Sequence, residues 1–323
     1  MPSGIVMPKS TKWPTTRKKK LMHFLRSRKI IRNLDLYLLI LPVIIFYVVF
    51  HYGPMYGLQL AFKDYIAIDG ILGSPWVGFE HFARFFGSPY FLRLIGNTLS
   101  ISILQLLFGF PIPILLALMI NEVSNNRMKK ITQNITYIPY FLSTVVIVGM
   151  LKNFTHPDYG IINIMIEKSG GIKINFIQEA SWFRTLYIAS GIWQSMGWNS
   201  IIFIASLSGV DPQLHESAKI DGAGRMQRIW HINIPAILPT IIIVLILNVG
   251  SLMNIGFEKA FLMQNDLNLS TSDIIPTYSY RVGIQGAQYS YATAISFFNS
   301  IINFTLLVTI NALSRRVNST SLW

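Results

Sequence analysis

The sequence predicts an all-α membrane protein, and three features of its 323 residues lead to this prediction. Hydrophobic residues make up 52% of the chain and charged residues only 13%, a composition typical of membrane proteins rather than soluble ones. The apolar residues gather in six runs, each near the length of about 20 residues that crosses a bilayer as a helix. Lys and Arg are concentrated in alternate segments between these runs, which is the pattern that sets orientation in a membrane.

The six predicted spans follow one another along the chain with polar connections between them. They are Leu36–Phe50, Gly96–Ile120, Ile135–Leu151, Thr185–Val210, Ala236–Phe257 and Tyr291–Leu313. The first run has no small-x-small ending for a signal peptidase, so we interpret it as a retained span. Pro111, Pro113 and Pro139 fall inside spans, where neighbouring helices can accommodate a kink.

The Lys and Arg counts predict how these spans are oriented. The first, third, fifth and last connecting segments hold 18 of the 27 basic residues, and the other three hold 9. The positive-inside rule therefore places both termini in the cytoplasm. The predicted domains are a basic cytoplasmic tail over residues 1–34, a six-span domain over residues 35–315 with a cytoplasmic loop at 211–235, and a short cytoplasmic tail over residues 316–323.

The formal net charge of +13 raises the question of a nucleic-acid partner. Ten of the 27 basic residues lie in the first 34 residues, directly before the first span, and the others are scattered between apolar runs. A polybasic end before a span is typical of an orientation signal that lies on anionic membrane lipid. We therefore expect membrane lipid, and no nucleic acid, as a partner.

Several kinds of chemistry are missing from the sequence. No G-x-x-x-x-G-K-[S/T] phosphate loop occurs, so we expect no ATP hydrolysis by this chain. There is no cysteine, and the six histidines lack the spacing of metal ligands, so we predict neither catalytic nor metal-binding residues. The interiors of the spans hold no Asp, Glu, Lys or Arg, which argues against coupling to an ion gradient.

The spans do contain neutral hydrogen-bonding and aromatic side chains. Buried amides are costly unless paired, so these groups should face a partner helix or a cavity. The candidates for binding a substrate are Trp193, Gln194, Trp198, Asn199, Asn248 and Asn254. The alternative is that they only join helices to one another, or that the two tryptophans only pack.

A polar segment, residues 211–235, separates the fourth and fifth predicted spans. Asp211 suits a helix N-cap and Pro212 its first position, since Pro lacks the N–H that a first turn leaves unpaired. Gly222 and Gly224 should end this helix in a sharp turn, and Arg225 to His231 can form a second short helix. A helix–turn–helix at the membrane surface is suited to docking into a partner.

This segment resembles the cytoplasmic EAA loop in the membrane subunits of binding-protein-dependent ABC importers. The family pattern is EAA, three residues, G, nine residues and I-x-L-P, and the chain has Glu216-Ser217-Ala218, Gly222 and Ile232 to Pro235 at this spacing. Ser217 and Ile234 are small departures from it. The resemblance implies that the ATPase is contacted by Glu216, Ser217, Ala218, Asp221, Gly222, Ala223 and Arg225.

The resemblance extends over nearly the whole chain, to permeases of the maltose-permease superfamily and its branch for complex oligosaccharides. It includes the stretches GSPWVGFEHFARFF, GFEKAFLMQN and SRRVNSTSLW. It implies a type I importer permease in the bacterial cytoplasmic membrane that works by alternating access. The implied partners are a second, similar permease forming a heterodimer, two copies of an ABC ATPase that bind ATP and Mg, and an extracytoplasmic solute-binding protein. No cofactor is implied for this chain.

Two other functions remain open at this stage. One is a permease for a non-sugar solute with the same docking loop, and the other is a membrane enzyme or scaffold, for which no catalytic cluster is found in the sequence. The sugar itself, acidic or neutral, is not specified. The absence of basic residues inside the spans argues against recognition of uronates by charge in a cavity between them.

Overall fold

The computed structural model describes residues 33–318, with side chains as far as Arg316. Within this range the chain is helical, and an isolated bridge between Lys63 and Trp76 is its only extended pairing. The predicted all-α class is therefore confirmed. Most of the predicted basic tail (1–34) and of the C-terminal tail (316–323) lies outside the described residues, and the predicted domain limits stay a prediction.

The described chain divides into two units after Leu58, and the first unit is a run of consecutive helices. It contains α2 (Leu34–Tyr47), the π-helix η1 (Val48–Tyr52), α3 (Gly53–Met55) and the start of the 3₁₀-helix η2 (Tyr56–Phe62). None of the residues of α2, η1 and α3 is buried, although most are apolar. Such a helix needs lipid or protein around it, as expected for a membrane span.

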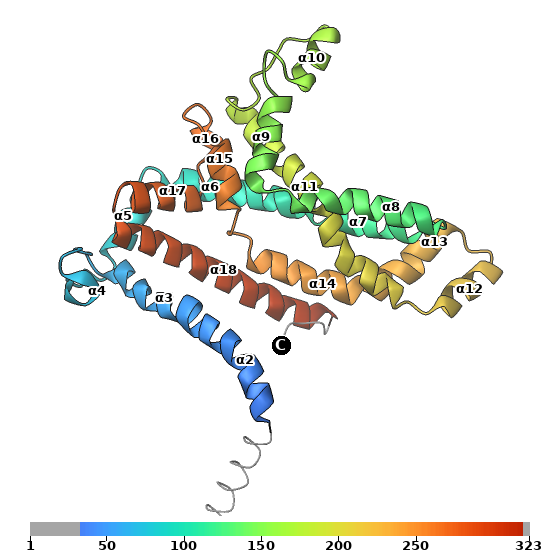
Figure 1. Ribbon diagram of the computed structural model, residues 1–323, viewed down its shortest axis with the longest axis horizontal. Coiled ribbons are helices and arrows are strands. Elements are labelled where there is room, and N and C mark those ends of the chain that lie inside the picture. The colour runs from blue at the N-terminus through green and yellow to red at the C-terminus, as the bar shows by residue number, and fades with distance from the viewer. Residues whose placement is uncertain (1–32, 319–323) are drawn as a thin grey trace, which may run out of the picture. The chain divides into compact units, whose positions relative to one another are not determined.

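The second unit, from Gln59 onward, holds the rest of the helices (Figure 1). Its longer elements are α6 (Phe91–Leu104), α7 (Pro111–Asn121), α8 (Asn126–Tyr137), α9 (Thr144–Phe154), α11 (Ala180–Ser208), α14 (Ile234–Gly250) and α18 (Tyr289–Asn318). Its shorter elements are α4 (Gly70–Gly73), α5 (Glu80–Phe86), η3 (Gln105–Gly109), η4 (Ile138–Phe141), α10 (Ile161–Lys168), α12 (Pro212–Ile220), α13 (Arg225–Arg228), η5 (Ile229–Asn233), α15 (Phe257–Met263), α16 (Leu269–Ser272), α17 (Ile275–Tyr280) and η6 (Arg281–Gln285). Helix α11 packs along α7, and α14 packs along α18.

Four helical segments of the described chain are long and apolar enough to cross a membrane, and a fifth span arises if one bent pair is counted. The four are Leu34–Phe62, Phe91–Asn121, Arg225–Gly250 and Tyr289–Arg316. Helix α11 is not among them, but its 29 residues would extend about 43 Å at 1.5 Å per residue. The predicted total of six spans therefore stays a prediction.

The third predicted span, Ile135–Leu151, is not the single kinked helix that we expected. The segments Asn126–Phe141 and Thr144–Phe154 meet at an angle of 99°. Pro139 has no N–H to continue the helix, and the chain becomes extended at Leu142. The Ser143 side chain then caps α9 by accepting a hydrogen bond from Val146 N at 3.3 Å. The break is thus fixed by a proline followed by a new helix cap.

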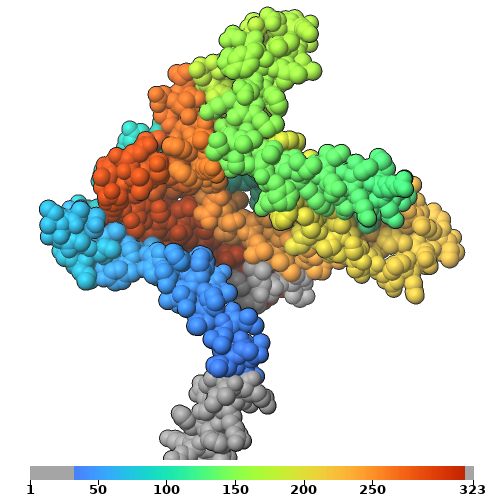
Figure 2. Space-filling model, in the orientation of Figure 1, coloured from blue at the N-terminus to red at the C-terminus, as the bar shows by residue number. Residues whose placement is uncertain are grey.

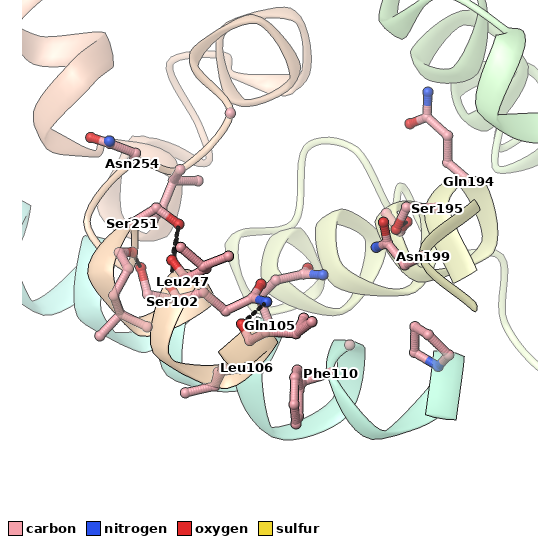
Figure 3. Close-up of a pocket in the computed structure, with 18 of the residues that line it drawn as sticks. Ser102, Gln105, Leu106, Phe110, Gln194, Ser195, Asn199, Leu247, Ser251 and Asn254 are labelled. Atoms are coloured by element: carbon pink, nitrogen blue, oxygen red, sulfur yellow. Dashed lines mark hydrogen bonds between the residues drawn. The ribbon is translucent and has the colours of Figure 1, made fainter. Parts of the chain in front are cut away.

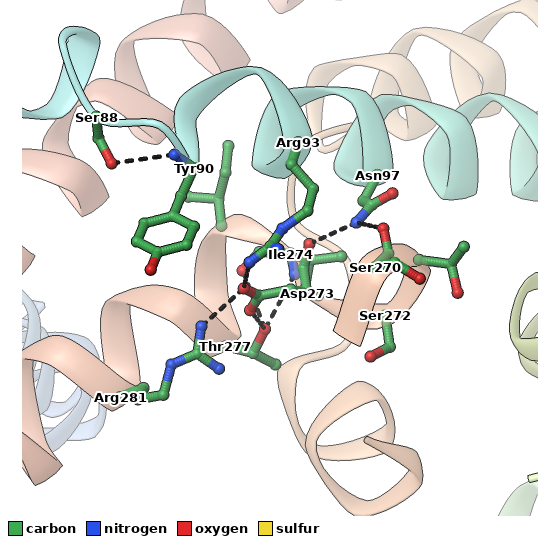
Figure 4. Close-up of polar contacts among 12 residues, drawn as sticks. Ser88, Tyr90, Arg93, Asn97, Ser270, Ser272, Asp273, Ile274, Thr277 and Arg281 are labelled. Carbon is green, nitrogen blue, oxygen red and sulfur yellow. Dashed lines mark hydrogen bonds and ion pairs between the residues drawn. The ribbon is translucent and has the colours of Figure 1, made fainter. Parts of the chain in front are cut away.

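A buried carboxylate joins two elements of the second unit (Figure 4). The Asp273 side chain is fully buried, and its Oδ2 lies 2.7 Å from Arg281 Nη2 and 3.1 Å from Arg93 Nη2. Asn97 on α6 donates to the backbone oxygens of Ser270 and Asp273 at 3.0 Å, and accepts from Arg184 Nη2 of α11 at 3.1 Å. This network fixes the segment between α16 and α17 against α6 and α11.

Replacing this carboxylate should destabilise the fold. We expect Asp273→Asn to lower the free energy of unfolding by about 2 kcal/mol, because two partly exposed guanidinium groups lose a buried ionic partner. The melting temperature of the purified protein in detergent measures this effect. Glu167→Gln is the control, since Glu167 pairs with Lys173 at the surface and exposed pairs contribute little. Equal melting temperatures for the two variants would contradict the expectation.

Candidate functional site

The polar segment between α11 and α14 folds as a helix–turn–helix, with the predicted first helix and glycine turn. The second helix is not the separate short helix that we expected, because α13 continues through η5 into α14 as one helical segment, Arg225–Gly250. Asp211 Oδ1 accepts from Gln213 N at 2.9 Å, with Pro212 in the first position of α12. Gly222 has φ +77°, a left-handed conformation that favours glycine, and a Cβ there would meet nothing within 4 Å. Gly224 N donates to Gln227 Oε1 at 2.7 Å and starts α13. The turn therefore demands glycine at 222 because of its backbone conformation, not because neighbouring atoms crowd it.

The surface of this segment combines exposed charges with exposed apolar groups. Glu216, Ser217, Asp221 and Arg225 are exposed, while Ala218 and Ala223 are half-buried. Exposed apolar side chains accompany them, with exposed fractions of 53% for Leu214, 87% for Ile220, 65% for Met226 and 61% for Trp230. Within residues 33–318, Glu216 and Asp221 form no ion pair, so they do not brace the two helices against each other. A hollow of about 300 Å³ lies between the helices and includes Asp221 and Gly222 in its lining.

The same segment is tied to α7 by a polar cluster. Arg228 Nη2 lies 3.9 Å from Glu122 Oε2, at the end of α7, and Arg228 Nη1 donates to the Ala223 oxygen at 3.1 Å. Asn233 is buried and donates to Glu122 Oε1 at 3.5 Å. The helix–turn–helix is therefore connected to three long helices: α11 and α14 through the chain, and α7 through Glu122.

A second feature of this unit is a cavity of about 620 Å³ between the long helices. Its walls come from α6, η3, α7, α11, α14 and α15. Figure 3 shows Ser195 and Asn199 of α11 on one side, with Gln105, Leu106 and Phe110 below and Leu247 and Ser251 on the opposite side. On the face shown in Figure 2, the surface is hollowed between the orange and the green segments of this unit.

Five of the six predicted substrate-binding residues line this cavity: Gln194, Trp198, Asn199, Asn248 and Asn254. Trp193 is not among the lining residues. Three of the five also make contacts of the kind that join helices. Gln194 donates to the Leu142 oxygen at 3.1 Å, the Trp198 ring stacks on Tyr140 at 4.5 Å, and Asn254 accepts from Asn303 Nδ2 at 2.9 Å. Both interpretations of these residues thus have structural support, and their contact with a substrate stays a prediction.

Two amides that line the cavity are not used within the fold. In the part of the chain that the structure describes, the side chains of Asn199 and Gln105 make no hydrogen bond. Gln105 was missed in the sequence analysis, although it is an amide within a predicted apolar span, the same signal that identified Gln194. Ser102 and Ser195 also line the cavity, but each donates its hydroxyl to a backbone oxygen, of Leu252 and Gly191 respectively.

The cavity wall also holds a cation, which corrects the expectation that no basic residue is available there. Lys259 of α15 is 8% exposed and lines the cavity. Its Nζ donates to the Tyr187 oxygen at 2.7 Å and lies 4.7 Å from the centre of the Tyr187 ring. Burial lowers the pKa of this ammonium to about 7. The predicted fifth span ends at Phe257, which puts Lys259 in the connection after it, and the packing of α15 against α11 brings Lys259 to the cavity.

The helix–turn–helix and most of the cavity lie in a part of the chain that matches a known protein family. Residues 109–319, which contain the helix–turn–helix and most of the cavity wall, match the family described as binding-protein-dependent transport system inner membrane component. The chain belongs to this family. It is therefore a permease, a multi-pass membrane component of a transport system, and the resemblance noted in the sequence is confirmed.

Individual relatives are similar to this permease over nearly their whole length. The polygalacturonan/rhamnogalacturonan transport system permease protein YteP of Bacillus subtilis is 44% identical over 89% of this chain and 90% of its own. Protein LplB of the same organism is 42% identical over 90% of this chain and 92% of its own. A crystal structure of a bacterial ABC transporter involved in the import of the acidic polysaccharide alginate contains a chain with 42% identity and a TM-score of 0.84, covering 90% of this chain and 98% of that one.

The two unpaired amides give a direct test of the cavity. We expect Asn199→Ala and Gln105→Ala each to lower the transport rate of the assembled permease about fivefold, through loss of roughly 1 kcal/mol of hydrogen bonding to the solute. Solute uptake into vesicles, at equal amounts of assembled complex, is the measurement. Asn153→Ala, which removes an exposed amide of α9, should leave uptake unchanged. Normal uptake by both cavity variants would favour a purely packing role for the polar groups.

Proposed function

We propose that this chain is one of the two membrane subunits of an ATP-driven ABC importer for oligosaccharides, including fragments of complex polysaccharides. The observation that carries the proposal is the match over nearly the whole chain to a polysaccharide-transport permease at 44% identity. The cavity supports it, because its amides and its tryptophan offer hydrogen bonds to hydroxyl groups and an apolar face for a sugar ring. A permease for a non-sugar solute has no comparable support.

The other subunits follow from the same relatives. A second structure of the alginate transporter, 42% identical to this chain, is a complex with a periplasmic protein that holds an alginate pentasaccharide. By analogy, the permease pairs with a second, similar permease, two ABC ATPases and an extracytoplasmic solute-binding protein. ATP and Mg bind to the ATPases, and this chain carries neither. Docking of the ATPase on α12 and α13 would move α11, α14 and, through Glu122, α7.

Uptake by the reconstituted complex tests this function. Vesicles with both permeases, the ATPase and the binding protein should accumulate labelled oligosaccharide only when ATP is supplied on the ATPase side. Complexes without this chain are the control. Accumulation without ATP, or no uptake of any oligosaccharide, would overturn the proposal.

The proposed orientation places both termini and residues 211–235 in the cytoplasm. The chain has no native cysteine, so single cysteines report the topology directly. Ser124→Cys should react with an impermeant thiol reagent only from the cytoplasmic side, and Ser169→Cys only from outside. Both positions are exposed in the fold, so a lack of labelling does not follow from burial. The opposite pattern would invert the topology and remove the docking argument.

Gly222 provides the test of the docking loop. We expect Gly222→Asp to lower transport at least about tenfold and to weaken capture of the ATPase in a pull-down, because the new side chain strains a left-handed turn at the docking surface. Gly170→Asp is a matched control, since Gly170 has φ +84° and equally open surroundings but lies in a predicted outer loop. If the two variants behave alike, the loss reflects backbone strain alone and not docking.

A further inference from the structure

The cavity has one strongly asymmetric feature, a buried cation without an anion. Lys259 is the only charged residue among the described residues that line the cavity. Its ammonium is close to a backbone oxygen and an aromatic ring, both of Tyr187, but no carboxylate of residues 33–318 forms an ion pair with it. Within this unit, the charge of the Lys259 ammonium is therefore compensated only by the Tyr187 oxygen and ring.

Burial of such a group is costly. An ammonium removed from water loses hydration, which one carbonyl and one ring only partly replace. The lowered pKa of Lys259 has the same cause. An ammonium has three donors, and the structure assigns one of them to the Tyr187 oxygen. An anion that enters the cavity would supply both the missing acceptors and the missing charge.

The cavity wall beside Lys259 is formed by Gly191 and Gln105, which line the cavity with it. A Cβ on Gly191 would lie 3.1 Å from Lys259 Nζ and 3.6 Å from Gln105 Oε1, so the absence of a side chain at 191 makes room for the ammonium itself. The Gln105 amide, which has no partner in the fold, therefore lies close to the ammonium. Together they present a cationic donor and an uncharged amide on adjoining parts of one wall.

We propose that Lys259 recognises a carboxylate of the transported oligosaccharide, so that the substrate class of this permease is oligosaccharides with uronic-acid units. The carboxylate accepts hydrogen bonds from Lys259 Nζ, and the Gln105 amide and the neutral amides of α11 and α14 pair with sugar hydroxyls. This inference rests on the proposed function and adds the charge of the substrate to it. Charge-assisted hydrogen bonds of this kind are stronger than neutral ones, particularly away from bulk water.

Lys259 also has a structural contact, because its bond to Tyr187 joins α15 to α11. A purely structural residue would affect neutral and acidic substrates alike. The experiment therefore compares ligands of one shape that differ only in charge. Trigalacturonate and trimannuronate carry carboxylates, and their methyl esters do not.

The test uses the complete importer with Lys259→Gln, which keeps a donor near Tyr187 but removes the charge, and with Lys259→Met. Binding of the four trisaccharides to the purified complex and their uptake into vesicles are both measured. Lys173→Met, which removes a surface lysine paired with Glu167, is the control. We expect both Lys259 variants to bind and transport the acid form at least about tenfold less well, and to treat the methyl ester as the wild type does. The control should match the wild type for every ligand.

The other outcomes separate this inference from the proposed function. Equal losses for acid and ester, or no loss for the acid, would overturn the role of Lys259. Wild-type uptake of neutral arabino-oligosaccharides without uptake of either uronate would overturn the substrate class and leave the importer function intact. Failure of the wild type to take up any of these sugars would overturn the importer function itself.

Discussion

The hydrocarbon interior of a membrane offers no water to polar groups, and this constraint explains most of the architecture. Every backbone N–H and C=O within a span must be paired inside the protein, so the chain is helical and its apolar side chains face outward. Polar side chains are kept where they have a partner, a cavity or an aqueous surface. The Asp273 network, the amides around the cavity and the charged helix–turn–helix are three solutions to this one constraint.

The second unit connects its two candidate sites through the same helices. Helices α11 and α14 carry the helix–turn–helix between them and also line the cavity. Glu122 adds α7, whose first residues border the cavity as well. A displacement of α12 and α13 therefore acts on three helices of the cavity wall at once. Under the proposed function, alternating access uses this connection to link the docking surface to the solute cavity.

The lining of the cavity is apolar or neutral except for one lysine. Most of its lining is apolar or neutral, so sugar hydroxyls and ring faces can be bound without a strong preference for charge. Lys259 breaks this pattern on one wall, beside Gly191 and Gln105. A single cation would distinguish a carboxylate-bearing oligosaccharide from a neutral one at low cost to the rest of the site.

Local chemistry was sufficient to predict part of this protein from its sequence. Apolar runs of membrane length predicted the helical class, and the residues from Asp211 to Gly224 predicted the cap and the turn of the helix–turn–helix, because each depends on a few adjacent residues. Five cavity residues were found in the same way, since an amide in an apolar run needs a partner or a cavity. The continuation of α13 into α14 was not predicted.

The tertiary structure decided what depends on distant segments. It placed Trp193 outside the lining, bent the chain by 99° after Pro139, and brought Lys259 from a predicted loop to the cavity wall. Hydropathy reports only how apolar a stretch is, whereas the position of Lys259 depends on how α15 packs against α11, a contact between residues about seventy positions apart in the chain.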